Sequence, residues 1–185
     1  MSNAEEDLDL IKAFIGGDET SFNRLVLKYQ QKIYWHARRM TGNHFDADEV
    51  VQEVLMVMYK KLKDFEQRSS LYTWIYKITS TRSINFIKRR KLKENFSIDD
   101  DSFSNMETDE SIADNLEVKE KLKKLDYVLQ KLPDKQREVF ILRNFEEMSY
   151  KDISNITGIS IGGLKANYFH AFKKVVGLMN EKNNG

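Results

Sequence analysis

The stretch that says most about the fold is residues 149–165, SYKDISNITGISIGGLK. Ser149 can cap a short helix, and Gly158 can supply the tight turn after it, because glycine adopts a positive φ at little cost. Ser160 can then cap a second helix. Two helices joined by a short turn with glycine are typical of a helix-turn-helix, although an ordinary helical hairpin is the alternative for this stretch alone.

The helix that begins after Ser160 is predicted to have two faces. At 100° per residue, the face toward the core is formed by Leu164, Tyr168, Ala171 and Val175. In a helix-turn-helix the opposite face enters the major groove of DNA, where Lys165 can reach a guanine edge or a phosphate and Phe169 can touch thymine methyl groups. The candidate residues for contact with duplex DNA are Arg143, Ser160, Lys165, Ala166, Phe169, His170 and Lys173.

The composition favours helices throughout the chain. Among its 185 residues there is a single proline, Pro133, and no alternating strand pattern, so we expect an all-α protein. The chain has no cysteine, which excludes thiolate chemistry. Its only three histidines are scattered along the sequence, so no metal site is expected. Glu146 and Glu147 are adjacent and face different directions on a helix, which suits acid–base catalysis poorly. No catalytic residue and no cofactor is therefore expected.

The charges divide the chain into two halves. Residues 77–93 hold seven basic side chains and no acidic one, whereas residues 96–114 hold seven acidic side chains and no basic one. The acidic stretch is also rich in Ser, Asn and Thr, as solvated linkers are. We therefore expect helical domains at 5–95 and 115–180, joined flexibly by an acidic linker at 96–114.

The N-terminal half is predicted to form four helices. They span residues 6–15, a segment capped by Asp18 that ends near Gly42, a segment that starts at Asp46, and a segment that follows the loop 66–70. In the last of these, Tyr72 and Tyr76 lie off the apolar face that includes Trp74. Aromatic rings beside a basic cluster suit single-stranded DNA, because stacking accepts any base and cations follow the backbone.

Five segments carry a resemblance to a known family. They are GDETSF at 17–22, DADEVVQE at 46–53, YTWIYKI at 72–78, LP at 132–133 and SYKDI at 149–153. Their order and spacing resemble those of bacterial RNA polymerase sigma factors of the extracytoplasmic-function type in the sigma-70 family. The resemblance extends over nearly the whole chain and implies a transcription initiation factor that binds core polymerase and opens promoters.

The resemblance also implies partners and roles. A polar face of the third helix would dock on the clamp helices of the polymerase β′ subunit: Asp48, Glu49, Gln52, Glu53 and Met56. The 66–70 loop, the fourth helix and its basic end would bind single-stranded DNA at the minus-ten element: Gln67, Arg68, Ser69, Tyr72, Tyr76, Thr81, Lys88, Arg89 and Arg90. The C-terminal domain would contact the β flap and read the minus-thirty-five element as duplex. An anti-sigma factor is a further expected partner.

The chain departs from the family pattern in both DNA-binding regions. Gln67 stands where the family usually has glycine, and Thr81 where it usually has asparagine. In the recognition helix, Gly163 replaces a usual threonine, and the pair Gly162–Gly163 costs the helix roughly 2 kcal/mol relative to alanine. We therefore expect a weaker grip on phosphates and an altered sequence preference.

A stand-alone helix-turn-helix regulator, which binds operators without polymerase, is the main alternative. Such a protein would not need the polar face at Glu49–Met56 or the aromatic and basic fourth helix. No apolar run approaches the roughly 18 residues of a membrane span, and the acidic N-terminus lacks a secretory signal. A cytoplasmic location is therefore expected.

Overall fold

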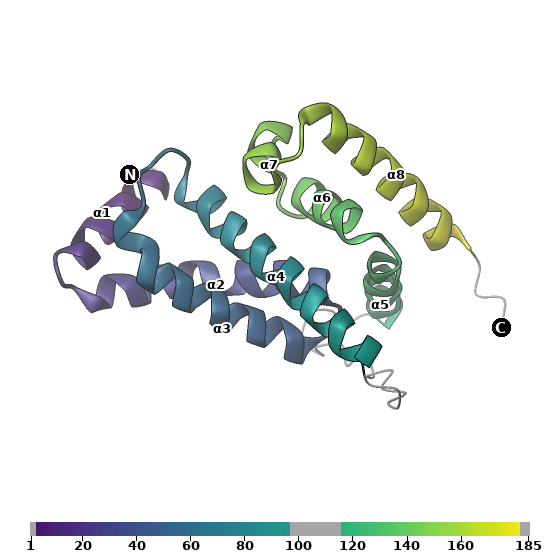
Figure 1. Cartoon of the computed structure of the whole chain (residues 1–185), viewed down its shortest axis with the longest axis horizontal. Coiled ribbons are helices and arrows are strands. Elements are labelled where there is room, and N and C mark those ends of the chain that lie inside the picture. Colours follow the sequence, from purple (N-terminus) through teal and green to yellow (C-terminus); the bar gives the residue numbers. More distant parts are fainter. Residues whose placement is uncertain (1–2, 97–115, 182–185) are drawn as a thin grey trace.

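A computed structural model describes residues 3–96 and 116–181, and the regular structure of these residues is entirely helical. The elements are α1 (Asn3–Ile15), α2 (Glu19–Thr41), α3 (His44–Lys61), the short 3-10 helix η1 (Leu62–Asp64), α4 (Leu71–Phe96), α5 (Leu116–Gln130), α6 (Asp134–Asn144), α7 (Tyr150–Thr157) and α8 (Ile161–Asn180). Figure 1 shows two groups, α1–α4 and α5–α8, with α8 on the outer side of the second group.

Side-chain caps set most helix boundaries where the sequence predicts them. Asp18, Ser149 and Ser160 each accept a backbone N–H of the first turn, and Gly42 ends α2 in the left-handed conformation at φ 93°. The start of the third helix differs from the prediction: α3 begins at His44 and not at Asp46. Its cap is Asn43, whose side chain accepts the Asp46 backbone N–H at 2.8 Å.

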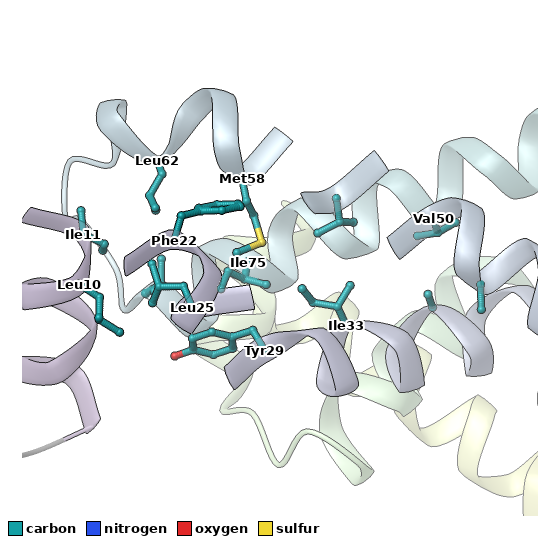
Figure 2. Packing of buried hydrophobic residues seen from close by; sticks show 14 of the residues in the cluster. Leu10, Ile11, Phe22, Leu25, Tyr29, Ile33, Val50, Met58, Leu62 and Ile75 are labelled. Atoms are coloured by element: carbon teal, nitrogen blue, oxygen red, sulfur yellow. The ribbon is translucent and has the colours of Figure 1, made fainter. Parts of the chain in front are cut away.

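The core of the first group lies between α1, α2, α3 and the start of α4. Phe22, Leu25 and Ile33 of α2 meet Val50 and Met58 of α3, as Figure 2 shows. The repeat of apolar side chains every three or four residues puts these residues on one face of each helix. The opposite face of α3 is thereby left for solvent.

The second group builds its core around the helix-turn-helix. Leu142 of α6, Ile153 of α7 and Leu164 of α8 are fully buried in one cluster. A second cluster joins Leu129 of α5 to Ala171 of α8. The inward face of α8 is the predicted one, and burial of this face fixes which side of the helix points outward.

The two groups pack directly against each other, which differs from the expectation of halves that are only flexibly joined. Met40 of α2, Ile87 of α4 and Ile141 of α6 form a buried apolar cluster between them. Close approach also occurs at Gly42, where a Cβ atom would lie 3.0 Å from Cγ of Gln130. Apolar side chains of both groups thus leave water together, which favours the packed arrangement.

The predicted acidic linker at 96–114 lies outside the described residues, apart from Phe96 at the end of α4. The boundaries assigned to the two domains therefore stay predictions. Among the described residues, no helix has both the length and the apolar character needed to cross a membrane.

Candidate polymerase and nucleic-acid interfaces

The outward face of α8 is open to solvent. Lys165, Ala166, His170 and Lys173 are exposed, and the Phe169 side chain is 62% exposed. Ser160 caps the helix by accepting the Gly163 backbone N–H at 3.2 Å, which satisfies one of the free N–H groups of a first turn that contains two glycines. The predicted duplex-contacting residues on α8 are therefore brought together on one accessible face.

Arg143 lies at the head of the helix-turn-helix, at the end of α6. Its guanidinium donates to the Met148 carbonyl at 2.8 Å and lies 5.3 Å from the centre of the Tyr150 ring. The side chain is exposed, so these contacts hold it in place without removing it from solvent. It is thus positioned beside the turn that leads into α7.

Sequence reasoning missed two apolar residues that extend the outward face of α8. Phe172 is 48% exposed and Val176 is 41% exposed. They follow Phe169 by three and seven residues, and these spacings return to the same side of a helix. Their spacing from Phe169 was a signal already present in the sequence.

We call the residues Asp48, Glu49, Gln52, Glu53 and Met56 the α3 contact face. Glu49 and Gln52 are exposed, and the Met56 side chain is 58% exposed. Phe45 and Tyr59, which the sequence analysis did not select, are exposed at helical spacing on the same side. The face therefore combines acidic residues with several large apolar side chains.

The basic end of α4 is less free than the sequence suggests. Arg89 donates to the Glu53 carboxylate at 2.6 Å, and Arg82 lies 3.5 Å from the same carboxylate. Arg90 donates to the Asp46 carboxylate and to the Thr41 carbonyl. Of the predicted backbone-binding trio, only Lys88 is shown exposed without a described ion pair within residues 3–96 and 116–181. Folding therefore brings two predicted surfaces, for polymerase and for DNA, into contact.

The 66–70 loop exposes Gln67 and Arg68 beside the start of α4. Gln67 has a φ of 55°, a left-handed conformation that explains why glycine suits this position and why glutamine is strained there. A pocket of about 430 Å³ lies next to the loop, lined by side chains that include Lys28, Lys32 and Tyr72. Its aromatic and basic lining is compatible with a nucleobase and its phosphate.

Tyr76 is not exposed as the sequence analysis expects. It is completely buried among α6, α7 and α8, and its hydroxyl donates to the Glu146 carboxylate. Tyr72 is half-buried, and its hydroxyl lies 3.3 Å from the same carboxylate. We call these two residues the tyrosine face of α4. The two aromatic rings are four residues apart and so lie on one side of α4, and the second group packs against this side and covers it. Thr81, further along α4, stays exposed.

Burial shifts the pKa values of this region. Loss of hydration, followed by the charge of Glu146, raises the pKa of Tyr76 above its usual range, and the same causes raise the pKa of Tyr72 to about 12. Burial also raises the pKa of Glu146, against the hydrogen bond from Tyr76. The tyrosines are thus neutral donors at physiological pH.

A second buried polar group joins α2, α4 and α6. The Ser80 hydroxyl lies 3.1 Å from Nε2 of His36 and also hydrogen-bonds to the Glu138 carboxylate. Burial, together with the nearby Arg39 charge, lowers the pKa of His36 to about 3. Burial raises the pKa of Glu138 to about 7. Within the described ranges, no group of three or more acidic or histidine side chains is arranged to hold a metal ion.

Comparison with known families assigns both halves. The family model "Sigma-70 region 2" matches residues 25–93, and the family model "Sigma-70, region 4" matches residues 122–175. The first range contains the α3 contact face and the tyrosine face of α4. The second range contains the helix-turn-helix and the outward face of α8.

Curated relatives match nearly end to end. The chain is 30% identical to the RNA polymerase sigma-H factor of Pseudomonas aeruginosa over 181 residues, which covers 92% of each chain. It is 28% identical to the ECF RNA polymerase sigma-E factor of Escherichia coli, which covers 92% of this chain and 93% of that protein. These matches extend over both helical groups.

Two solved structures share the fold. The sigma factor RpoE, in complex with the anti-sigma factor NepR from Bartonella quintana, has a TM-score of 0.70 at 22% identity and covers 88% of this chain and 98% of that chain. CnrH, in complex with the cytosolic domain of CnrY, has a TM-score of 0.70 at 20% identity, with 96% and 99% coverage. The chain thus belongs to the extracytoplasmic-function group of the sigma-70 family and is a sigma factor that directs promoter recognition by RNA polymerase.

Proposed function

We propose that three surfaces divide the work of this sigma factor. The α3 contact face docks on the clamp helices of the polymerase β′ subunit, the 66–70 loop and α4 bind the melted minus-ten element, and α8 reads the minus-thirty-five element as duplex. The observation that carries the proposal is that α3 and α8 each bury one face in the core and leave the opposite face open. A sigma factor has no catalytic site of its own, so these surfaces are its functional sites.

Recognition of duplex DNA is assigned to the outward face of α8. A recognition helix presents its N-terminal residues to base edges in the major groove. Lys165 lies in the second turn and can reach a guanine or a phosphate, and Phe169 lies one turn later, where it can pack on thymine methyl groups. Arg143 is held beside the turn and would bind the phosphate backbone.

Binding of the melted strand is assigned to the 66–70 loop and the pocket beside it. The pocket has aromatic walls and two lysines, Lys28 and Lys32, at its margin. Lys28 is paired with Glu6 at 3.0 Å and with Asp7 at 2.6 Å, whereas Lys32 lies 5.3 Å from the centre of the Tyr72 ring. A flipped base would stack in this pocket while Lys32 and Arg68 approach its phosphates.

Docking on the clamp helices is assigned to the α3 contact face. Met56, flanked by Phe45 and Tyr59, supplies apolar anchors, and Glu49 supplies charge for a basic partner. Glu53 has its carboxylate between Arg82 and Arg89, so it also holds α3 against α4. Bacterial transcription takes place in the cytoplasm, so this function implies a cytoplasmic location.

Inhibition by an anti-sigma factor is a further part of the proposal. The structures of RpoE and CnrH contain NepR and the cytosolic domain of CnrY, respectively. This chain shares their fold and exposes an apolar stripe on α8, formed by Phe169, Phe172 and Val176. A helical inhibitor could compete with DNA for that stripe.

Run-off transcription with purified core polymerase tests the proposed function. We expect transcripts from specific promoters when the protein is added to core polymerase, and none from either component alone. Transcript mapping after overexpression would supply the templates. Binding to an operator without any effect of core polymerase, and without transcripts, would instead support a stand-alone regulator.

Variants of α3 test the docking assignment. The double variant Glu53→Lys with Met56→Ala should weaken binding to core polymerase, but its lysine would confront Arg82 and Arg89 within the fold. Glu49→Lys with Met56→Ala avoids most of this conflict, because Glu49 is exposed and 3.8 Å from Arg89. Unchanged co-purification of the second variant with core polymerase would contradict the assignment. Lys60→Ala, exposed at the end of the same helix, is the control.

A further inference from the structure

The two sides of the outward face of α8 differ in chemistry. The sequence of the helix contains three lysines, one histidine and no acidic residue. At about 100° per residue, Phe172 and Val176 lie on one side of the outward face, and His170 and Lys174 lie on the other, with Lys173 between them. All five side chains are exposed. One side of this face is therefore apolar, and the other side is basic.

The end of α5 borders the basic side of α8. The Lys174 ammonium donates to the Lys131 carbonyl at 2.7 Å, and a buried apolar cluster joins the two helices beneath this contact. Lys131 is exposed, and its ammonium lies 4.8 Å from the centre of the Tyr127 ring, which is 51% exposed. The two helices thus present one continuous surface. We call it the α5–α8 basic surface: Tyr127, Lys131, His170, Lys173 and Lys174.

The positive charge of this surface is not neutralised within the described part of the chain, where none of its three lysines forms an ion pair. Asp126 of α5 is turned toward α2, and its carboxylate lies 3.9 Å from the Arg38 guanidinium. The hydrogen bond from Lys174 also covers a carbonyl at the C-terminal end of α5, where the helix dipole places partial negative charge. The surface is therefore suited to an anionic partner.

The geometry of duplex DNA suggests what this partner is. A helix in the major groove runs between the two phosphate backbones that border the groove. If α8 turns Lys165 and Phe169 toward the base edges, its basic side faces one of these backbones. Helix α5 packs on that side, and packed helices lie about 8–10 Å apart. The end of α5 would therefore meet the same backbone at the edge of the groove.

From these observations we infer that the end of α5 is a second duplex-binding element, in which Lys131 and Tyr127, together with Lys174 of α8, bind the phosphate backbone beside the minus-thirty-five element. The inference rests on the duplex-reading role proposed above for α8. Duplex DNA is favoured over an acidic protein, because Lys173 makes the surface continuous with the outward face of α8. Lysine and tyrosine side chains are common donors to phosphate, and such contacts fix register without reading sequence. They would offset the lack of arginine in α8.

Loss of one charge on α5 tests the inference. The full chain is titrated onto a fluorescent duplex that carries the minus-thirty-five element of a mapped promoter with flanking duplex on both sides. Lys131→Gln should weaken binding about threefold or more, on matched and scrambled duplexes alike, and should reduce the salt dependence of log K by about 0.9. Lys131→Arg keeps the charge and should bind like the unsubstituted chain.

Lys123→Gln is the matched control for Lys131→Gln. Lys123 is exposed on α5 about two turns before Lys131, outside the α5–α8 basic surface, so its loss should change neither the affinity nor the salt dependence. Both variants should unfold at the same temperature as the unsubstituted chain, because both side chains are exposed.

Neutral phosphates locate the contact. Single methylphosphonates, placed in turn along each strand of the same duplex, remove one phosphate charge at a time. At a position beside the minus-thirty-five element on one strand, the substitution should weaken binding of the unsubstituted chain and of Lys123→Gln. It should not weaken Lys131→Gln further, because that contact is already lost. If every position weakens Lys131→Gln as much as the unsubstituted chain, the inference is overturned.

The same measurements separate failure of the inference from failure of the proposed function. If the unsubstituted chain does not distinguish matched from scrambled duplexes, the duplex-reading role of α8 fails. If it does, and Lys131→Gln binds DNA as tightly as Lys123→Gln, only the inference about α5 fails. If Lys131→Gln keeps its affinity for DNA but co-purifies less with core polymerase, the surface docks on a protein, which also overturns the inference.

Discussion

The outward face of α8 and the tyrosine face of α4 carry similar predictions, yet the fold treats them in opposite ways. Phe169 is 62% exposed on α8, whereas Tyr76 is fully buried on α4. Helix α8 lies at the outer edge of the molecule, while α4 lies on the side of the first group that faces the second group, as Figure 1 shows. A residue off the main apolar face of a helix is therefore accessible only where no second module reaches it.

The largest expected effect is a loss of stability on substitution of Arg137, which is buried where the two groups meet. Its guanidinium donates to the carbonyls of Leu129, Leu132 and Gln130 at the end of α5, and to the Met40 carbonyl of α2. Arg137→Ala leaves these buried acceptors unpaired and should lower the free energy of unfolding by about 3–5 kcal/mol. Urea denaturation measures the change.

Lys135→Ala is the control for Arg137→Ala, because Lys135 is exposed on the same helix. Its effect should stay within about 0.5 kcal/mol. If Arg137→Ala costs no more than this control, Arg137 does not hold the two modules together.

The second effect is a pH dependence at the buried Glu138. Its folded pKa, about 7, is raised above the unfolded value, so its contribution to stability is complete below the unfolded pKa and is lost as pH rises through 7. His36, with a folded pKa lowered to about 3, acts in the opposite direction below its unfolded pKa. Between the unfolded pKa values of the two groups, the contribution of Glu138 to stability falls with rising pH, whereas that of His36 rises.

A comparison of Glu138→Gln with the unsubstituted chain isolates the carboxyl, because both proteins retain His36. The groups around Glu138 are the charged Lys135 on its own helix and the Ser80–His36 pair on α4 and α2, which is neutral in this pH range. Between pH 5 and pH 8, the variant should gain stability relative to the unsubstituted chain by on the order of 2 kcal/mol. Thermal unfolding over this range measures the difference; a constant difference would contradict the assignment.

On the outward face of α8, which is exposed, Lys165→Ala tests contact with duplex DNA. It should weaken binding to a minus-thirty-five duplex by about 1–2 kcal/mol, with no change in stability because the side chain is exposed. Fluorescence anisotropy with matched and scrambled duplexes measures the affinity. Loss only on the matched duplex identifies a base contact, and equal loss on both identifies a phosphate contact. Lys123→Ala on α5 controls for the change in charge.

The smallest effect concerns the two glycines at the start of α8. A Cβ atom at Gly162 would meet nothing within 4 Å, whereas one at Gly163 would lie 3.0 Å from Ile159 Cγ2. Gly162→Ala should therefore stabilise the protein by about 0.5–1 kcal/mol through lower chain entropy. Gly163→Ala should gain less. Equal gains in melting temperature would show that Ile159 moves aside freely.

Much of the fold was predictable because its signals are local. Caps at Asp18, Ser149 and Ser160, and the turn at Gly158, depend on residues within one helical turn. The buried side of α8 followed from its spacing, with Leu164 and Ala171 inside. The start of α3 was misplaced by two residues because two residues, Asn43 and Asp46, can each cap a helix.

The candidate surfaces were less predictable, because their exposure depends on long-range packing. The pairing of Arg89 with Glu53 joins residues 36 positions apart, and the bond from Tyr76 to Glu146 joins residues 70 positions apart. Neither pair has a local signature. From the sequence alone, each of these residues is therefore expected to be free for an external partner.

The sequence by itself determined the helices, their caps, the two modules and the family, since propensity, periodicity and motif order are properties of short segments. Only the tertiary structure decided that the modules pack together and that Glu146 covers the tyrosine face while Phe169 stays open. The physical reason is that burial of an apolar helical face lowers the free energy against any complementary surface. Which surface that is depends on how distant parts of the chain meet in space.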